Sequence, residues 1–150
     1  MKKETIHTDA APAAVGPYSQ AVKVGDFLFT SGQIALDPET MELVEGDVQT
    51  QTHQVLKNLD AVLQAGGSSL ENVVKTTVFL ASIDDYRAVN AVYEVYFSDS
   101  KPARSAFAVQ DLPLGALVEI EAVAFVEKKK EDPLEAFREV ELDVPTIATP

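Results

Sequence analysis

The segment Val118–Val126 constrains the possible folds most, because every second residue in it is apolar. Its odd positions include Glu119 and Glu121, whereas its even positions are all apolar: Val118, Ile120, Ala122, Ala124 and Val126. Successive side chains of a strand point to opposite faces of a sheet. The pattern therefore predicts a strand with one face in a hydrophobic core and the other lining an interface or a site.

Four other segments are predicted to be strands. Val22–Val24 and Phe27–Ile34 flank Gly25-Asp26, a dipeptide that favours a tight hairpin turn. Val73–Leu80 is rich in β-branched residues, and Ala103–Val109 is a second apolar run near the final strand. Together with the final strand, they make five predicted strands.

Two helices are predicted between these strands. Asp47 is the expected N-cap of the first helix, and Gly66-Gly67 ends its apolar pattern. Asp84 or Asp85 is expected to cap the second helix, which Pro102 stops. The apolar stripe of this second helix consists of Tyr86, Val89, Tyr93, Tyr96 and Phe97.

The predicted element order is β-β-α-β-α-β-β, an α+β fold in which two helices cover one face of a mixed sheet. The other face is left uncovered and partly apolar. In a chain of 150 residues, such a face favours self-association, and closed cyclic oligomers are the usual solution.

The composition limits the chemistry that is available. The chain has no cysteine, and its only histidines, His7 and His53, lie far apart in sequence. We therefore expect no thiolate nucleophile, no histidine-based triad and no metal site. Catalysis would have to use Arg, Glu, Tyr, Ser, backbone groups and water, without a cofactor.

The formal net charge of −12 repels a phosphate backbone, so nucleic-acid binding is not expected. The first residues lack the apolar run of a secretory signal, and no stretch reaches the length of a membrane span. We expect a cytoplasmic protein that does not bind membranes.

Two charged residues are candidates for catalysis. Arg104 follows Pro102, and its planar guanidinium can bind a carboxylate through two parallel hydrogen bonds, although a surface salt bridge is the ordinary role of an arginine. Glu119 lies in an apolar strand and could orient or deprotonate a water molecule. Alternatively, Glu119 is a rim charge on an edge strand, and Glu121 fits that description equally well.

Two short motifs place turn-forming residues beside hydroxyl groups. They are Gly16–Gln20, which contains Tyr18, and Thr30–Gln33, which contains Ser31 and Gly32. Backbone N–H groups near Gly32 could bind a substrate oxygen, and Tyr18 could close a pocket. The alternative for each motif is a simple bend with a satisfied side chain.

Six motifs in this order closely resemble the RidA (YjgF/YER057c/UK114) family, and together they span about residues 4–127. They are Gly16-Pro17-Tyr18-Ser19-Gln20-Ala21, Thr30-Ser31-Gly32-Gln33-Ile34, Val73–Leu80, Val89-Asn90-Ala91-Val92-Tyr93-Glu94, Pro102-Ala103-Arg104-Ser105 and Val118–Ala124. Six motifs in the same order are far more specific than any one of them.

The resemblance implies a chorismate-mutase-like homotrimer with three clefts between neighbouring subunits. It also implies hydrolytic deamination of 2-aminoacrylate, 2-aminocrotonate and their imine tautomers to 2-keto acids and ammonia. By the same resemblance, Arg104 would clamp the substrate carboxylate and Glu119 would polarise the attacking water. Tyr18, Ser31 and Gly32 would line the cleft, and Asn90 would support it.

One position departs from the family's pattern. Many close relatives have a cysteine two residues after the arginine, where this chain has Ala106. A role that depends on that thiol is therefore excluded. The mechanism through arginine and water is unaffected.

The chain divides into a RidA-like domain, residues 1–130, and an extension, residues 131–150. The extension has six acidic residues and one arginine. Three interpretations stay open for it: a segment that packs on the protein's own surface, a disordered or artificial addition, and a peptide that docks on a partner.

Other classes of function also stay open. The protein could be a non-catalytic module that binds 2-keto acids, or a trimeric scaffold or cargo that is recruited through its C-terminal extension. A ribonuclease or translation-inhibitor activity is attributed to some relatives, but the acidity of the chain argues against it.

Overall fold

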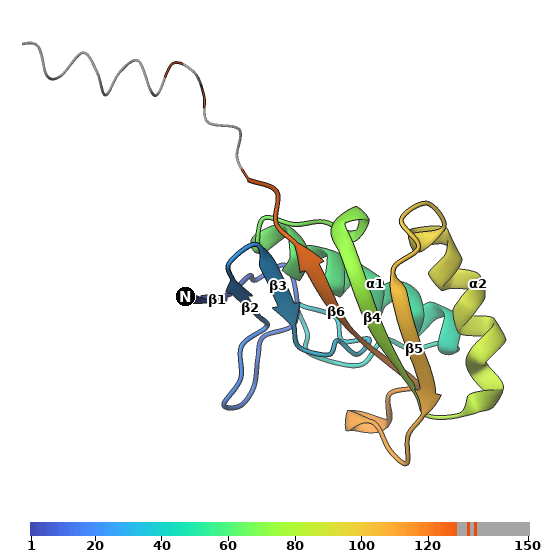
Figure 1. Ribbon diagram of the computed structural model, residues 1–150. Helices are drawn as coiled ribbons and strands as arrows, with labels where there is room; N and C mark the ends of the chain where they lie inside the picture. Colours follow the sequence, from blue (N-terminus) through green and yellow to red (C-terminus); the bar gives the residue numbers. More distant parts are fainter. Residues whose placement is uncertain (129–131, 133, 135–150) are drawn as a thin grey trace, which may run out of the picture.

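A single sheet with helices on one side organises the chain (Figure 1). The computed structural model describes residues 1–128, 132 and 134, so most of the predicted extension at 131–150 lies outside the described residues. The main elements are β1 (Lys3–Ile6), β2 (Ala21–Val24), β3 (Phe27–Thr30), α1 (Val48–Ala65), β4 (Val73–Leu80), α2 (Tyr86–Phe97), β5 (Ala103–Ala108) and β6 (Val118–Phe125).

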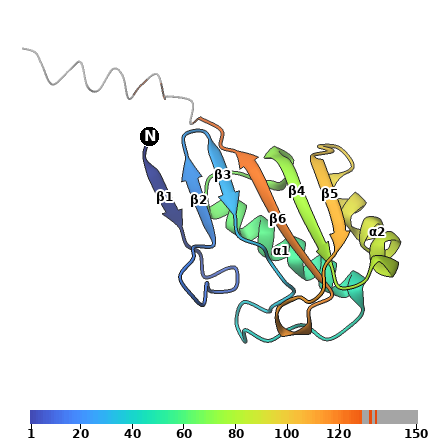
Figure 2. The same ribbon diagram turned by 60° about the horizontal axis from the view of Figure 1, so that its bottom comes forward.

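The six strands lie in the order β1-β2-β3-β6-β4-β5. Neighbouring strands are antiparallel, except that β4 and β5 run parallel, as the crossover through α2 requires. Both helices lie on the same side of the sheet in both views (Figures 1 and 2). The predicted α+β architecture with a mixed sheet and two helices on one face is confirmed.

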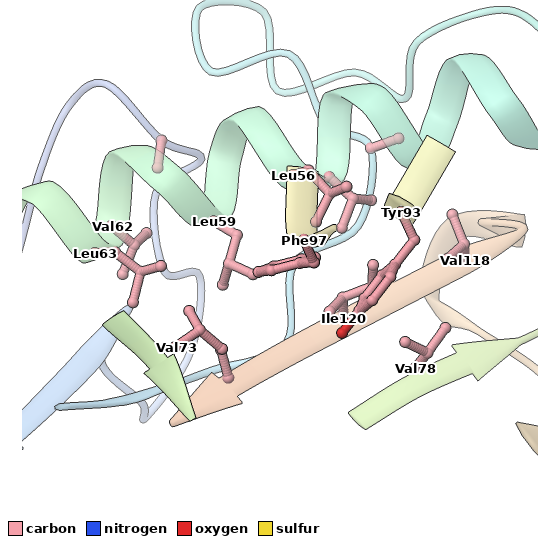
Figure 3. Close-up of a cluster of buried hydrophobic side chains, with 14 of the residues drawn as sticks. Leu56, Leu59, Val62, Leu63, Val73, Val78, Tyr93, Phe97, Val118 and Ile120 are labelled. Carbon is pink, nitrogen blue, oxygen red and sulfur yellow. The ribbon is translucent and has the colours of Figure 1, made fainter. Parts of the chain in front are cut away.

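The core lies between the helices and β6. Leu56, Leu59 and Leu63 come from one face of α1 and are fully buried, as their spacing predicts. They lie toward Val118 and Ile120 of β6, with side chains from β4 and α2 between them (Figure 3). The even positions 118 to 124 of β6 are all buried, so the predicted core face of this strand is confirmed.

The opposite face of the sheet is open and aromatic. Phe27 pairs directly with Phe125 across β3 and β6, and Phe29 lies on the same face two residues along. Phe107 extends this face to β5 and meets Phe79 edge to face, with ring centroids 5.4 Å apart. Phe27, Phe29, Phe107 and Phe125 are each 39–47% exposed, which is unusual for so many large apolar side chains on one surface.

The predicted element order lacks one strand, because β1 at Lys3–Ile6 was not expected. This strand is mostly exposed and only Ile6 is buried, so it has no apolar alternation that a sequence pattern could show. Its place in the sheet comes from backbone pairing with β2. The sheet therefore has one more strand than the five that were predicted.

The strand predicted at Phe27–Ile34 ends instead at Thr30. The chain leaves the sheet at Ser31 and Gly32, then returns through a single bridge between Gln33 and Ile120. The N–H groups of Gln33 and Ile120 donate to each other's carbonyl oxygens, at 2.9 and 3.1 Å. Small errors of one residue also occur at the ends of β5 and β6.

The helix caps are partly as predicted. The Asp47 carboxylate accepts a hydrogen bond from the Thr50 N–H at 2.9 Å and caps α1. Asp85 occupies the N-cap position of α2, but its side chain makes no capping bond. The reason is that a short 3-10 turn precedes α2, and Ser82 caps that turn by accepting from the Asp84 N–H. Neither helix in the described part of the chain has the length and apolar character that a bilayer crossing requires.

The buried side chain of Gln20 holds the segment between β1 and β2 in place. Its Oε1 accepts from the Thr8 N–H at 2.7 Å, and its Nε2 donates to the carbonyl oxygens of Pro12 at 2.8 Å and Thr8 at 3.0 Å. The hydrogen bond to Pro12 is buried and the two bonds with Thr8 are part-buried, so these backbone groups have limited access to water as alternative partners.

We expect Gln20→Leu to lower the free energy of unfolding by about 1–3 kcal/mol, because buried backbone groups lose their partners. Urea denaturation at a fixed protein concentration measures the change. The same substitution at Gln110, which is exposed, serves as the control and should change stability by less than about 0.5 kcal/mol. Equal stability of the two variants would contradict the structural role of Gln20.

Candidate active site

The break between β3 and its return at Gln33 brings Gly32 against the side chain of Glu119. A Cβ atom at position 32 would come within 2.9 Å of the Glu119 Cδ and 3.0 Å of its Cγ. A side chain at position 32 would force the Glu119 carboxyl group to move, so glycine allows this close approach. Gly32 and Glu119 thus form one unit, although they lie far apart in sequence.

Gly32 and Glu119 both line a hollow of about 650 Å³. Tyr18, Ser31, Gly32 and Glu119, all predicted as site residues, line this same hollow. The Ser31 hydroxyl donates to the Ser19 carbonyl oxygen at 2.6 Å, which leaves its oxygen lone pairs as acceptors. The alternative of an edge-strand charge is wrong for Glu119, because β6 lies in the middle of the sheet.

The carboxyl group of Glu119 has a raised pKa. Desolvation by its half-buried position is the main cause, and the nearby negative charge of Glu121 adds to it. Both effects favour the neutral form of the group. A carboxylate with a raised pKa is a better proton acceptor than an ordinary glutamate, which suits it to deprotonate a water molecule.

Arg104 lies in a cage of side chains from α2. Its Nη1 donates to the Asn90 Oδ1 at 2.7 Å, and its Nη2 donates to the Tyr86 hydroxyl at 3.0 Å. The guanidinium carbon also lies 4.8 Å from the ring centroid of Tyr93 and 5.6 Å from that of Tyr86. These contacts restrict the orientation of the guanidinium group.

The cage holds the charge of Arg104 without neutralising it. Within residues 1–128, 132 and 134, no carboxylate forms an ion pair with this guanidinium, so the alternative of a surface salt bridge is not observed. Tyr93 is itself fixed, because its hydroxyl and the buried Thr76 hydroxyl form a 2.7 Å hydrogen bond. Burial also raises the pKa of Tyr93, which keeps the phenol neutral beside the arginine. The arrangement suits the binding of an anion.

The residues of this cage that the sequence did not indicate are Tyr86, Tyr93 and Thr76. Tyr86, Asn90 and Tyr93 are separated by four and three residues, so they lie on one side of α2. In the sequence, the two tyrosines belong to the apolar stripe of the second helix. Arg104 lies on β5 and pairs with Thr76 on β4. Only this position shows that the two tyrosines also surround the guanidinium group.

The structure separates the six predicted site residues into two groups. Arg104 pairs with Thr76 on β4, whereas Glu119 pairs with Phe79, three residues further along. An odd spacing places the two side chains on opposite faces of the sheet. Their backbones are also two strands apart, roughly 10 Å across the sheet, and roughly 10 Å apart along it. One subunit therefore does not bring Arg104 and Glu119 to the same small substrate.

Comparison with known proteins agrees with the motifs. Residues 8–126 match the family described as Endoribonuclease L-PSP, which is also called the RidA or YjgF family. The chain belongs to this family. The identification made from the six motifs is thereby confirmed.

Several RidA-family relatives are similar over nearly their whole length. A RutC family protein of Pyrococcus horikoshii is 53% identical over 125 residues, which is 83% of this chain and 99% of the relative. The mouse 2-iminobutanoate/2-iminopropanoate deaminase is 51% identical over 122 residues, covering 81% and 90%. RidA from the Antarctic bacterium Psychrobacter sp., whose crystal structure is known, is 49% identical in sequence to this chain. The two structures superpose with a TM-score of 0.79 over 82% of this chain and 99% of the Psychrobacter chain.

These similarities support an imine or enamine deaminase activity for the family domain. The extension, residues 131–150, lies outside the region that matches the family, residues 8–126. The proposed division of the chain at residue 130 stays a prediction.

We expect Glu119 to titrate above the ordinary glutamate range, and we expect Glu121→Gln to lower its pKa. The substitution removes the repulsion between two negative charges, while the desolvation of Glu119 persists. NMR titration of the side-chain carboxyl carbons measures both values. Glu94→Gln on the exposed surface of α2 is the control and should leave the Glu119 pKa unchanged. An unchanged Glu119 pKa in Glu121→Gln would contradict the coupling.

Proposed function

We propose that the protein hydrolyses reactive 2-imino and enamino acids, such as 2-aminoacrylate, 2-aminocrotonate and their imine tautomers, to 2-keto acids and ammonia. The main support is that the chain holds one guanidinium aimed by a cage of side chains, and one half-buried carboxylate in a hollow. Relatives named 2-iminobutanoate/2-iminopropanoate deaminase are 51% and 49% identical to this chain.

This chemistry suits the residues that are present. A protonated imine is already electrophilic, so its hydrolysis needs orientation and one positioned water rather than a covalent nucleophile. Arg104 would bind the substrate carboxylate, and Tyr18, Ser31 and Gly32 would line the cleft while Asn90 supports the arginine.

Glu119, as a carboxylate, would accept a proton from the attacking water as its oxygen bonds to the imine carbon. Glu119 would then return this proton to the nitrogen of the resulting carbinolamine, and the C–N bond would break to release ammonia. The carbinolamine hydroxyl would give its proton to the regenerated Glu119 carboxylate as the carbonyl forms. Because only the ionised form can accept the proton, activity should fall as the pH falls through the raised pKa of Glu119. Removal of the Glu121 charge should move that fall to lower pH.

A homotrimer would bring the two groups of residues together. The open aromatic face of the sheet provides the apolar area for association, and a closed ring of three subunits would repeat one contact three times. Arg104 and Asn90 of one subunit would then face the hollow of its neighbour. This arrangement accounts for the position of Arg104 and Glu119 on opposite faces of each sheet.

A module that binds 2-keto acids without turnover is the second candidate, because the Arg104 cage alone suffices to hold a carboxylate. The alternative role, a scaffold or cargo recruited through residues 131–150, stays a prediction, because most of these residues lie outside the described part of the chain. The net charge of −12 counts against nucleic acid as a partner. We also retain a cytoplasmic location as a prediction.

We expect Arg104→Ala to lower the catalysed rate at least about 100-fold, because two charge-assisted hydrogen bonds to the substrate carboxylate are lost. The assay couples threonine dehydratase to the protein and follows 2-ketobutyrate release. Arg87→Ala, on the exposed side of the same region, is the matched control and should keep wild-type activity. If the wild type does not accelerate 2-ketobutyrate release, or if Arg104→Ala keeps full activity, the assigned mechanism is contradicted. Ligand binding without imine consumption would favour the binding module.

Mixed trimers test whether the site is shared between subunits. Arg104→Ala and Glu119→Gln should each be inactive alone, yet equal amounts mixed after dissociation should recover about a quarter of the wild-type activity. In a random cyclic trimer, each mixed assembly contains one interface with both functional residues. No recovery, with mixed trimers demonstrated by mass spectrometry, would show that Arg104 and Glu119 act within one subunit.

A further inference from the structure

A polar residue interrupts the buried face of α1. Asn58 is only 1% exposed, and most of the other buried residues of this helix are apolar. A buried amide group is unfavourable unless its donors and its acceptor find hydrogen-bond partners. The partners of Asn58 therefore indicate its role.

Every polar atom of the Asn58 side chain has a partner. Its Nδ2 donates to the carbonyl oxygen of Leu36 at 2.8 Å and to that of Ile34 at 3.2 Å. Its Oδ1 accepts from the Gln54 Nε2 at 2.9 Å. A primary amide has two N–H donors, so both are used on two backbone carbonyl groups of a single segment.

The segment that Asn58 holds is the one that leaves the sheet after β3. Its residues 31–34 line the hollow beside Glu119. Beyond β3 the regular strand pairing ends, and one bridge between Gln33 and Ile120 ties the segment to the sheet. The bonds from Asn58 follow directly after that bridge. The segment is thus attached to β6 by its backbone and to α1 by one side chain.

The position of this segment determines how closely Gly32 approaches Glu119. A Cβ atom added to Gly32 would lie only 2.9 Å from the Glu119 Cδ, so the backbone at this position takes the place of water beside the carboxyl group. Desolvation of this kind is the main cause of the raised pKa of Glu119. A segment that moved away from β6 would let water reach the carboxyl group.

We propose that Asn58 is a positioning residue for the candidate active site, although it does not itself line the hollow. By holding the carbonyl groups of Ile34 and Leu36 from α1, it sets the approach of Gly32 to Glu119. The inference rests on the proposed deaminase function, in which Glu119 accepts the proton. It links the helix layer to the reacting groups through a single buried amide.

A purely structural role is the alternative, because buried carbonyl groups that lose their donors destabilise any fold. The two roles differ in what happens to Glu119 in the protein that stays folded. Replacing Asn58 by an apolar residue changes no charge. Glu121 on β6 is untouched, and among the described residues that line the hollow Glu119 is the only charged one. A change in the pKa of Glu119 would therefore report access of water.

We expect Asn58→Leu, which removes both donors at nearly constant volume, to lower the pKa of Glu119 toward the ordinary glutamate range. NMR titration of the side-chain carboxyl carbons measures this change. The catalysed rate of 2-ketobutyrate release in the threonine dehydratase assay should fall about tenfold or more, because the reacting groups are misplaced. The loss of activity at low pH should also move to lower pH, since the proton acceptor has become a weaker base.

Both quantities refer to folded protein, measured by circular dichroism. Asn58→Ala removes the same two donors and should act in the same direction, which separates the loss of hydrogen bonds from an effect of side-chain volume. If neither variant folds, Gln54→Met replaces them. It removes the donor to the Asn58 Oδ1 from a position that is only partly buried, and a smaller shift in the same direction is expected.

Thr52→Val is the matched control on the same helix. Thr52 is fully buried, and its hydroxyl donates to the Val48 carbonyl oxygen at 2.6 Å, within α1. The substitution removes one buried hydrogen bond at nearly constant volume without touching the segment after β3. It should leave the pKa of Glu119 and the rate of the folded protein at their wild-type values.

A wild-type pKa of Glu119 in the folded Asn58 variants, or in Gln54→Met where it replaces them, would overturn the positioning role even if the rate falls. An equal shift in Thr52→Val would overturn it as well. The titration needs no substrate. If the wild type does not accelerate 2-ketobutyrate release while the pKa shifts as expected, the deaminase proposal fails and the link from Asn58 to Glu119 stands.

Discussion

The central strand β6 separates two environments, and the rest of the molecule is arranged around that separation. Its even side chains are buried against α1 and α2, where they form the core with Leu56, Leu59 and Leu63. Its odd side chains lie on the open face, and they include Glu119. Because the two helices already cover one face, the open face with its exposed phenylalanines has no cover from the described residues. In the proposed trimer, the association of subunits and the formation of the site would therefore depend on the same surface.

The two charged groups proposed for catalysis are prepared in opposite ways. Glu119 is partly desolvated and has Glu121 beside it, so its protonated form is favoured and it becomes a stronger base. Arg104 keeps its positive charge, with two aromatic rings and an amide oxygen around it rather than a carboxylate. A chain with a net charge of −12 repels small anions in general. An arginine that no carboxylate among the described residues neutralises would provide the local attraction that the proposed anionic substrate needs.

Particular elements show how far the sequence pattern leads. The alternation in residues 118 to 126 predicted the two faces of β6, and helical spacing predicted the buried side of α1. The strand β1 was missed because three of its four residues are exposed, so that only Ile6 reaches the core and no apolar alternation marks the strand. The end of β3 was misplaced because the residues after Thr30 still look like a strand, whereas the chain leaves the sheet at Ser31 and Gly32 and returns only at Gln33.

The sequence by itself determined the fold class, the apolar faces of α1 and β6, the family and the choice of six candidate site residues, since these depend on periodicity and on motifs that lie within short segments. Only the tertiary structure decided how those six residues are divided, with Tyr18, Ser31, Gly32 and Glu119 in one hollow and Arg104 with Asn90 on the other side of the sheet. It also revealed the cage of Tyr86 and Tyr93 around Arg104. The physical reason is that strand order and register set the distances between segments, and no local pattern of residues encodes them.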